Sequence, residues 1–306
     1  MATTLEDRAA RARIRERPSY LSRKSAGDVI FDILNHAFLL GFALTIVYPF
    51  WVTILTSFSD VDSASSLGLK LWIPEWQFAA YRYAFSSYGN VGTAYANSIF
   101  RTVFGTLLSV SATILMAYPL SKKEIPFRNA MTIFLLITMF FSGGLIPTFL
   151  LVRNLGLIDS RWALILPQLV VGFNVIITRN FLMSLDRAFE ESAFMDGANY
   201  LQILTRIVVP LSKPVIATIS LWIAVFHWNS WFDALIYIND ESKIVLQLLL
   251  RRLIQQMNMA MQENMQNFML TEQVEMPTAA VRAAITILTI GPIVFFYPFL
   301  QKYFVK

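Results

Sequence analysis

Long apolar segments constrain this chain more than any other feature of its sequence. Six of them approach or exceed the roughly 20 residues that an α-helix needs to cross the ~30 Å hydrocarbon core of a bilayer. Only 15% of the residues are charged, against about 25% in soluble domains. The number and length of these runs disfavour the alternative, a soluble protein with a buried core. We therefore predict an all-α membrane protein with transmembrane helices at 33–58, 94–120, 129–152, 163–181, 215–238 and 279–300.

The basic residues indicate how these spans are oriented, because cytoplasmic loops carry an excess of Lys and Arg. With the amino terminus inside, fifteen basic residues fall on the cytoplasmic side and seven on the outer side. Both termini are therefore expected in the cytoplasm. The net charge of +5 then reports orientation, so no nucleic-acid partner is expected. We divide the chain into a basic, lipid-contacting tail (1–28) and a six-span domain (29–306), with a cytoplasmic segment at 186–213 and an outer loop at 239–277.

The cytoplasmic segment is charged and helix-prone, and it lies between two apolar spans. We expect a short helix at 189–195, a break at Gly197, and a second helix at 200–208. Glycine permits a sharp bend because it has no Cβ and adopts positive φ. Pro210 and Pro214 should keep this bent unit separate from the fifth span. Facing lipid, the unit would be an interfacial helix, and facing a protein cleft it would be a coupling element.

One motif in this segment has fixed spacing: Glu191-Ser192-Ala193, three residues, Gly197, nine residues, Ile207, two residues, Pro210. It resembles the signature of inner-membrane permeases of binding-protein-dependent ABC importers. That signature is Glu-Ala-Ala, three residues, Gly, nine residues, Ile, one residue, Leu-Pro. Ser192 and Val209 are mild departures from it.

The resemblance extends over nearly the whole chain. Asn97-Ser98 and the runs 227–231 and 299–304 are similar to the carbohydrate, maltose-type branch of the family. The runs 141–148 and 156–167 look like permeases for complex saccharides, including importers of uronate oligomers and of alginate. Such relatives usually continue past Lys306 with a glycine and a short tail.

The resemblance implies that the cytoplasmic segment docks in a groove of an ATPase subunit. Glu191 would contact basic groups there, Gly197 would form the bend, and small side chains would allow close approach. The chain has no Gly-x-x-x-x-Gly-Lys-Ser/Thr loop, so ATP and Mg would be bound by the partner ATPase and no cofactor or metal by this chain. The expected coupling residues are Glu190, Glu191, Ala193, Met195, Gly197, Ala198, Ile207 and Pro210.

The implied assembly is an importer in the bacterial inner membrane that contains this chain, a second permease subunit, an ATPase dimer and an extracytoplasmic solute-binding protein. A saccharide path needs aromatic faces and neutral hydrogen-bonding groups. Candidates are Asn174, Thr178, Trp222, Trp228, Asn229, Trp231, Asp233 and Tyr237, each with lipid exposure or burial between helices as the alternative. Asn229 and Asp233 favour a non-lipid face because their exposure to hydrocarbon is costly.

Three arginines lie near predicted span ends, where a long side chain can carry its charge to the interface. We expect such snorkelling for Arg101, Arg179 and Arg282. The alternative is that Arg101 and Arg282 line the path of an anionic uronate.

Two other classes of protein compete with the importer permease. A secondary transporter of a small polar solute would normally carry an internal repeat, which is not evident, and would not need the cytoplasmic segment. A membrane enzyme is disfavoured because His36 and His227 are far apart in the sequence and no catalytic motif surrounds them. The absence of cysteine excludes thiolate metal sites, disulfides and cysteine nucleophiles.

Overall fold

A computed structural model of the chain describes residues 26–60, 70–87, 91–267 and 278–301. Within these ranges all regular structure is helical, which confirms the predicted all-α class. The chain divides into two units, one ending at Val52 and the other beginning at Thr53. Most of the predicted basic tail, residues 1–25, lies outside the described ranges.

The first unit is built on α2 (Ala26–Ser57), a single helix that passes through Pro49 and whose last turn belongs to the second unit. Its large apolar side chains are exposed along most of its length, Phe38 and Leu40 among them. Water would disfavour such a surface, whereas lipid accommodates it without cost. This helix coincides with the predicted first span and is long and apolar enough to cross a bilayer.

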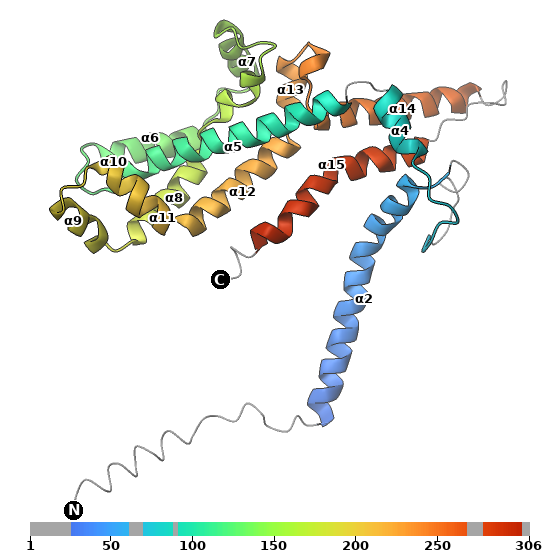
Figure 1. Cartoon of the computed structure of the whole chain (residues 1–306). Coiled ribbons are helices and arrows are strands. Elements are labelled where there is room, and N and C mark those ends of the chain that lie inside the picture. The colour runs from blue at the N-terminus through green and yellow to red at the C-terminus, as the bar shows by residue number, and fades with distance from the viewer. Residues whose placement is uncertain (1–25, 61–69, 88–90, 268–277, 302–306) are drawn as a thin grey trace, which may run out of the picture. The chain divides into compact units, whose positions relative to one another are not determined.

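The second unit centres on α5 (Val91–Ser121), the other single helix in the described ranges with the length and hydropathy of a span. It packs against α8 (Gly172–Ser184) and α12 (Lys213–Asn229) (Figure 1). Gly105 permits the approach of α12, because a Cβ at that position would lie 2.5 Å from Nε2 of the buried His227.

Three predicted spans are broken into shorter helices, so the structure does not confirm them as single transmembrane helices. The third breaks into α6 (Arg128–Phe140) and α7 (Leu145–Asn154), bent by 112° at a break that ends in Gly144, whose φ is 87°. The fourth begins as 3-10 turns (Arg161–Leu164 and Leu166–Gln168) before α8, with a bend of 52°. The fifth ends at Asn229 and resumes as α13 (Phe232–Tyr237). The length of an apolar run indicates whether a segment can cross a bilayer. It does not indicate where the helix within that segment bends.

Part of the predicted outer loop packs near the first turns of α5, together with two other helices. Here α4 (Ala79–Ser87), α14 (Leu246–Asn267) and α15 (Thr278–Gln301) contribute to one apolar cluster. α4 and α14 both contact α15, and α14 also contacts α5. The sixth predicted span agrees with α15. Residues 268–277 of the predicted outer loop lie outside the described ranges.

Candidate functional site

The predicted cytoplasmic segment folds into a bent helical knob, which we define as residues 188–211. It consists of α9 (Ala188–Met195), α10 (Tyr200–Ile203), a π-helical turn (Leu204–Val208) and α11 (Val209–Leu211), seen at the end of the second unit in Figure 1. The sequence therefore predicted both helices and the break between them.

Gly197 ends the first helix of the knob in the left-handed region, with a φ of 81°. The Gly197 amide donates to the Phe194 carbonyl and the Ala198 amide to the Ala193 carbonyl, both at 3.0 Å. This pair of bonds is the Schellman motif, which satisfies the last carbonyls of a helix and needs a residue without a φ penalty. The predicted bend at Gly197 thus has a specific local cause.

The second helix of the knob starts at a capping box and ends later than the sequence suggested. Asn199 and Gln202 bond each other's backbone amides through their side chains, both at 2.9 Å. The helix then continues through Pro210, and the chain turns by 82° beside Ser212. The knob is thus separate from α12, as expected, and the turn that separates them lies between Pro210 and Pro214. Pro214 lies in the first turn of α12, where a proline lacks only an amide that would be unpaired there.

The inner face of the knob is packed against the ends of α5 and α8. One buried apolar cluster joins Ala117, Tyr118 and Leu120 of α5, Val175 and Leu182 of α8, and Ala193, Ile203, Leu204 and Val208 of the knob. This cluster makes the knob a rigid extension of the two helices, because close-packed interiors deform little.

Ion pairs reinforce this packing at the rim of the cluster. Glu190 pairs with Lys122 and accepts a bond of 3.4 Å from the Tyr118 hydroxyl. The Lys122 ammonium lies 4.6 Å from the centre of the Tyr118 ring. Arg187 pairs with Glu124 at 3.3 Å, and the pKa of that exposed carboxyl is lowered by a bond from its own backbone and then by Arg187. Glu190 is therefore engaged within the chain.

The outer face of the knob exposes several large apolar side chains, which we call the knob patch: Phe189, Phe194, Met195, Tyr200 and Leu201. Met195 is 88% exposed, and the Phe194 and Tyr200 rings meet edge to face at 4.9 Å.

The other predicted coupling residues divide between the two faces. Glu191 and Pro210 are exposed, Ala198 and Ile207 are half-buried, and Ala193 faces the inner cluster.

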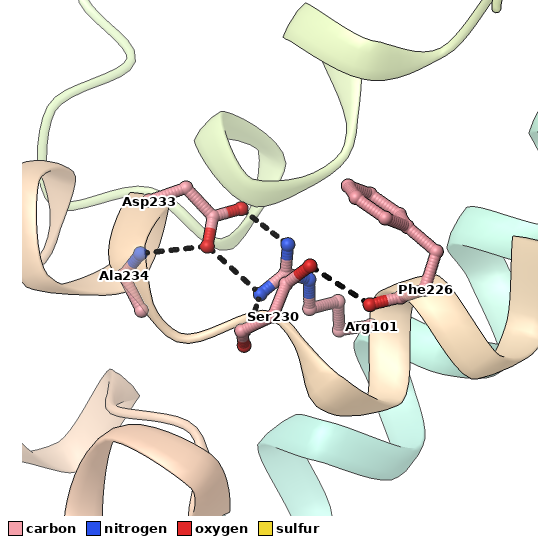
Figure 2. Close-up of polar contacts among 5 residues, drawn as sticks. All are labelled: Arg101, Phe226, Ser230, Asp233 and Ala234. Atoms are coloured by element: carbon pink, nitrogen blue, oxygen red, sulfur yellow. Dashed lines mark hydrogen bonds and ion pairs between the residues drawn. The ribbon is translucent and has the colours of Figure 1, made fainter. Parts of the chain in front are cut away.

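Arg101 of α5 is buried at the break between α12 and α13, with 1% of its side chain exposed. Its guanidinium binds both carboxylate oxygens of Asp233 and donates to the Ser230 carbonyl at 3.0 Å (Figure 2). Asp233 also accepts from the Ala234 amide at 2.9 Å, within the first turn of α13. The expectation that Arg101 snorkels was wrong, because it has a bidentate partner inside the protein. The sequence could have suggested this pair, because an arginine and an aspartate within two apolar spans each need a polar partner.

Four of the predicted path residues lie inside the subunit. Asn174 and Thr178 are buried on α8, and the Thr178 hydroxyl donates to the Asn174 carbonyl at 2.7 Å. The buried Trp228 indole donates to the Thr289 carbonyl at 3.0 Å. Tyr237 is buried and stacks on Phe149, with ring centres 6.3 Å apart.

The remaining candidates are more accessible but are spread over several contacts. Trp231 lies under the Arg251 guanidinium at 3.6 Å. Asn229 accepts from Gln247 at 3.4 Å. Trp222 is exposed and stacks on Phe173, with ring centres 6.0 Å apart. The structure does not bring the predicted path residues together in one cavity.

The other two arginines near span ends also bond to protein groups. Arg179 donates to the Leu120 carbonyl at 3.0 Å, and Arg282 to the Asn258 side chain at 3.0 Å. Within the described ranges, no three acidic or histidine side chains gather as metal ligands would.

A pocket that our sequence reasoning missed lies where α5 meets two loops. Its volume is about 510 Å³, and it is lined by Phe100, Asp159, Ser160, Arg161, Trp162 and Lys243. The available signal was the run 156–167, which carried the resemblance to complex-saccharide permeases. We call it the outer pocket.

The wall of the outer pocket is held by backbone bonds. The Asp159 carboxylate accepts hydrogen bonds from the Asn239 and Asp240 backbone amides at 2.7 and 2.8 Å. These bonds lower the pKa of Asp159, and the bond from the Asp240 amide has the larger effect. The pKa of Asp240 falls to about 2, because the Ser242 hydroxyl and amide donate to it and Lys243 adds a further bond. Both carboxylates are therefore ionised at neutral pH.

The structure thus combines apolar helices with a helical knob that packs on the ends of α5 and α8. The sequence matches the family of binding-protein-dependent transport system inner membrane components over residues 84–306, and the chain belongs to this family. It is therefore an inner-membrane ABC permease. The family favours this function over the secondary transporter, and it is one of transport subunits, not of enzymes.

Three similar proteins align with most of the chain, and the names of two of them refer to polysaccharides. The chain is 41% identical over 277 residues to the polygalacturonan/rhamnogalacturonan transport system permease protein YtcP of Bacillus subtilis (strain 168), covering 90% of this chain and 96% of that one. It is 39% identical over 279 residues to Protein LplC of the same organism, covering 90% and 92%. A solved bacterial ABC transporter involved in the import of the acidic polysaccharide alginate superposes with a TM-score of 0.80 at 36% identity, covering 92% and 99%.

Proposed function

We propose that this chain and a second permease subunit form the path of an importer for acidic oligo- or polysaccharides rich in uronate. One observation carries the choice of substrate. Two relatives whose names denote acidic polysaccharides align with 90% and 92% of the chain, at 41% and 36% identity. The family name supports a solute-binding protein as the source of the saccharide.

The proposed topology has six spans and cytoplasmic termini. The crossing segments would be α2, α5, α6 with α7, α8 with the 3-10 turns before it, α12 with α13, and α15. The tail 1–28 and the segment 186–213 would be cytoplasmic, and the loop 239–277 would face outward. The distribution of basic residues supports this orientation.

The knob is proposed to couple the spans to an ATPase dimer that binds ATP and Mg. Its outer face has the apolar patch that a protein interface requires, with Glu191 beside it. Its inner face is packed on α5 and α8, so a displacement of the knob would tilt both helices as one body. Ala193 and Glu190 would serve this connection within the chain, whereas Glu191, Met195 and the Gly197 bend would serve the contact with the ATPase.

Of the proposed path residues, Asn229 and Trp222 are exposed and Trp231 is half-buried, so these three are the ones open to contact with a saccharide. Asp233 would act indirectly: its ion pair with Arg101 would hold the break between α12 and α13, beside which Asn229 and Trp231 lie. Asn174, Thr178, Trp228 and Tyr237 would support the path from inside the helix packing.

Transport by the reconstituted complex tests this proposal. We expect uptake of trigalacturonate into proteoliposomes to require ATP and the solute-binding protein. Gly197→Val should uncouple ATP hydrolysis from uptake or release the ATPase, because left-handed backbone costs an L-residue about 1–2 kcal/mol. Gly197→Asn is the matched control, since Asn adopts this conformation more readily and a Cβ here meets no atom within 4 Å.

Two results would contradict the proposal. Uptake driven by an ion gradient without ATP would favour the secondary-transporter hypothesis. Full coupling of ATP hydrolysis to uptake in Gly197→Val would show that the bend at Gly197 is not needed for coupling.

A further inference from the structure

The outer pocket has no role in the coupling or in the path described so far. It is formed by Phe100 of α5, by the turn 159–162, and by Lys243, so three separate stretches of chain converge on it. The Asp159 amide donates to the Tyr237 carbonyl at 2.8 Å, and the Asp159 carboxylate accepts from the Asn239 and Asp240 amides, which follow α13. These bonds fix the wall of the pocket, which is an open depression with a volume of about 510 Å³.

One cation in this pocket lacks a carboxylate partner. Lys243 is paired with Asp240 at 3.1 Å. Arg161 instead lies over the Phe100 ring, with the guanidinium carbon 5.7 Å from the ring centre, and it forms no ion pair among the described residues. A guanidinium presents a planar fork of donors that fits a carboxylate in two-point fashion.

The rest of the lining suits a sugar ring. Phe100 and Trp162 meet edge to face with centres 5.9 Å apart, and Trp162 is exposed. Aromatic faces of this kind combine a large apolar area with a fixed geometry. The ionised Asp159 carboxylate has about four acceptor sites, so two backbone amides leave capacity for a sugar hydroxyl.

We propose that the outer pocket binds one uronate unit of the incoming saccharide. The sugar carboxylate would lie against Arg161, the ring against Trp162, and a hydroxyl against Asp159. The proposal rests on the proposed function, because the proposed topology puts these loops on the outer side and the proposed substrate supplies the carboxylate. The pocket would then receive the acidic chain where it leaves the solute-binding protein.

The test compares trigalacturonate with neutral maltotriose, using the complete complex in proteoliposomes with saturating solute-binding protein. Arg161→Gln should raise the KM for trigalacturonate about tenfold, the loss expected for one charge-assisted contact. Arg161→Lys should recover part of the affinity. Arg153→Gln is the matched control, because Arg153 is an exposed arginine in the last turn of α7 outside the pocket, and it should leave the KM unchanged.

The outcomes separate this proposal from the function on which it rests. If wild-type protein imports trigalacturonate with ATP but Arg161→Gln has the same KM, the pocket assignment is overturned and the function stands. Weaker association of the sugar-free solute-binding protein with Arg161→Gln would assign the pocket to protein docking and overturn the proposal as well. If wild-type complex imports maltotriose and not trigalacturonate, the substrate class itself fails.

Discussion

At Gly105 the backbone of α5 lies directly against the imidazole ring of His227 on α12. The ring is buried, and its Nε2, Cδ2 and Cε1 atoms would all lie within 3 Å of an added Cβ. Small residues commonly set the approach of two helices in a membrane, because close packing replaces the hydrophobic drive available in water. The contact therefore determines how closely α5 and α12 approach each other.

Gly105→Ala should destabilise the protein by about 1–3 kcal/mol, the usual cost of overpacking. Thermal unfolding of the detergent-solubilised protein measures this loss. Gly92→Ala is the control on the same helix, because a Cβ there meets no atom within 4 Å. Adding His227→Ala to Gly105→Ala should relieve the loss in part, and an unchanged melting temperature in Gly105→Ala would contradict the close contact.

Residue identity predicted some side-chain roles and missed others. Gly197 was identified as the bend, because few residues other than glycine adopt positive φ without cost. Arg101 was expected to snorkel, since its own sequence neighbourhood suggests no partner. Asp233 is 132 positions away in the sequence, and only folding places it beside Arg101.

Among elements, the break between α12 and α13 depends on a bond from a different helix. The Ser230 carbonyl and Asp233 carboxylate at this break both bond to Arg101 of α5 (Figure 2). The freed backbone carbonyl is thus satisfied by a side chain, as irregular backbone within a membrane requires. The break and the α5–α13 contact are therefore one structural unit.

Arg101→Met should cost about 3–5 kcal/mol, because it leaves the Asp233 carboxylate without its partner in a largely buried place. The double variant Arg101→Met/Asp233→Asn should recover much of this loss, since no buried charge remains and the amide oxygen can still accept from the Ala234 amide. A double-mutant cycle in thermal unfolding measures the coupling. Additive losses in the two single variants would show that the pair contributes no interaction energy.

For the whole molecule, the proposed topology predicts which loops a membrane-impermeant thiol reagent reaches. The chain has no cysteine, so each introduced cysteine reports alone. Arg153→Cys should react in intact spheroplasts, whereas Lys123→Cys and Met195→Cys should react only after permeabilisation. All three positions are exposed in this chain, and expression without the ATPase keeps Met195 uncovered, so accessibility does not limit the reaction. Labelling of Met195→Cys from outside would place the knob on the wrong side for an ATPase.

The amino-acid sequence by itself determined the all-α class, the apolar segments, the bent knob and the family signature. These features follow from local composition and spacing, to which lipid solvation and backbone preference respond directly. Tertiary structure decided the bends in three segments, the Arg101–Asp233 pair, the inward face of Ala193 and the outer pocket. The ion pair, the burial of Ala193 and the pocket each depend on residues distant in sequence that meet only in the folded chain. No local pattern specifies which partner a buried charge will find.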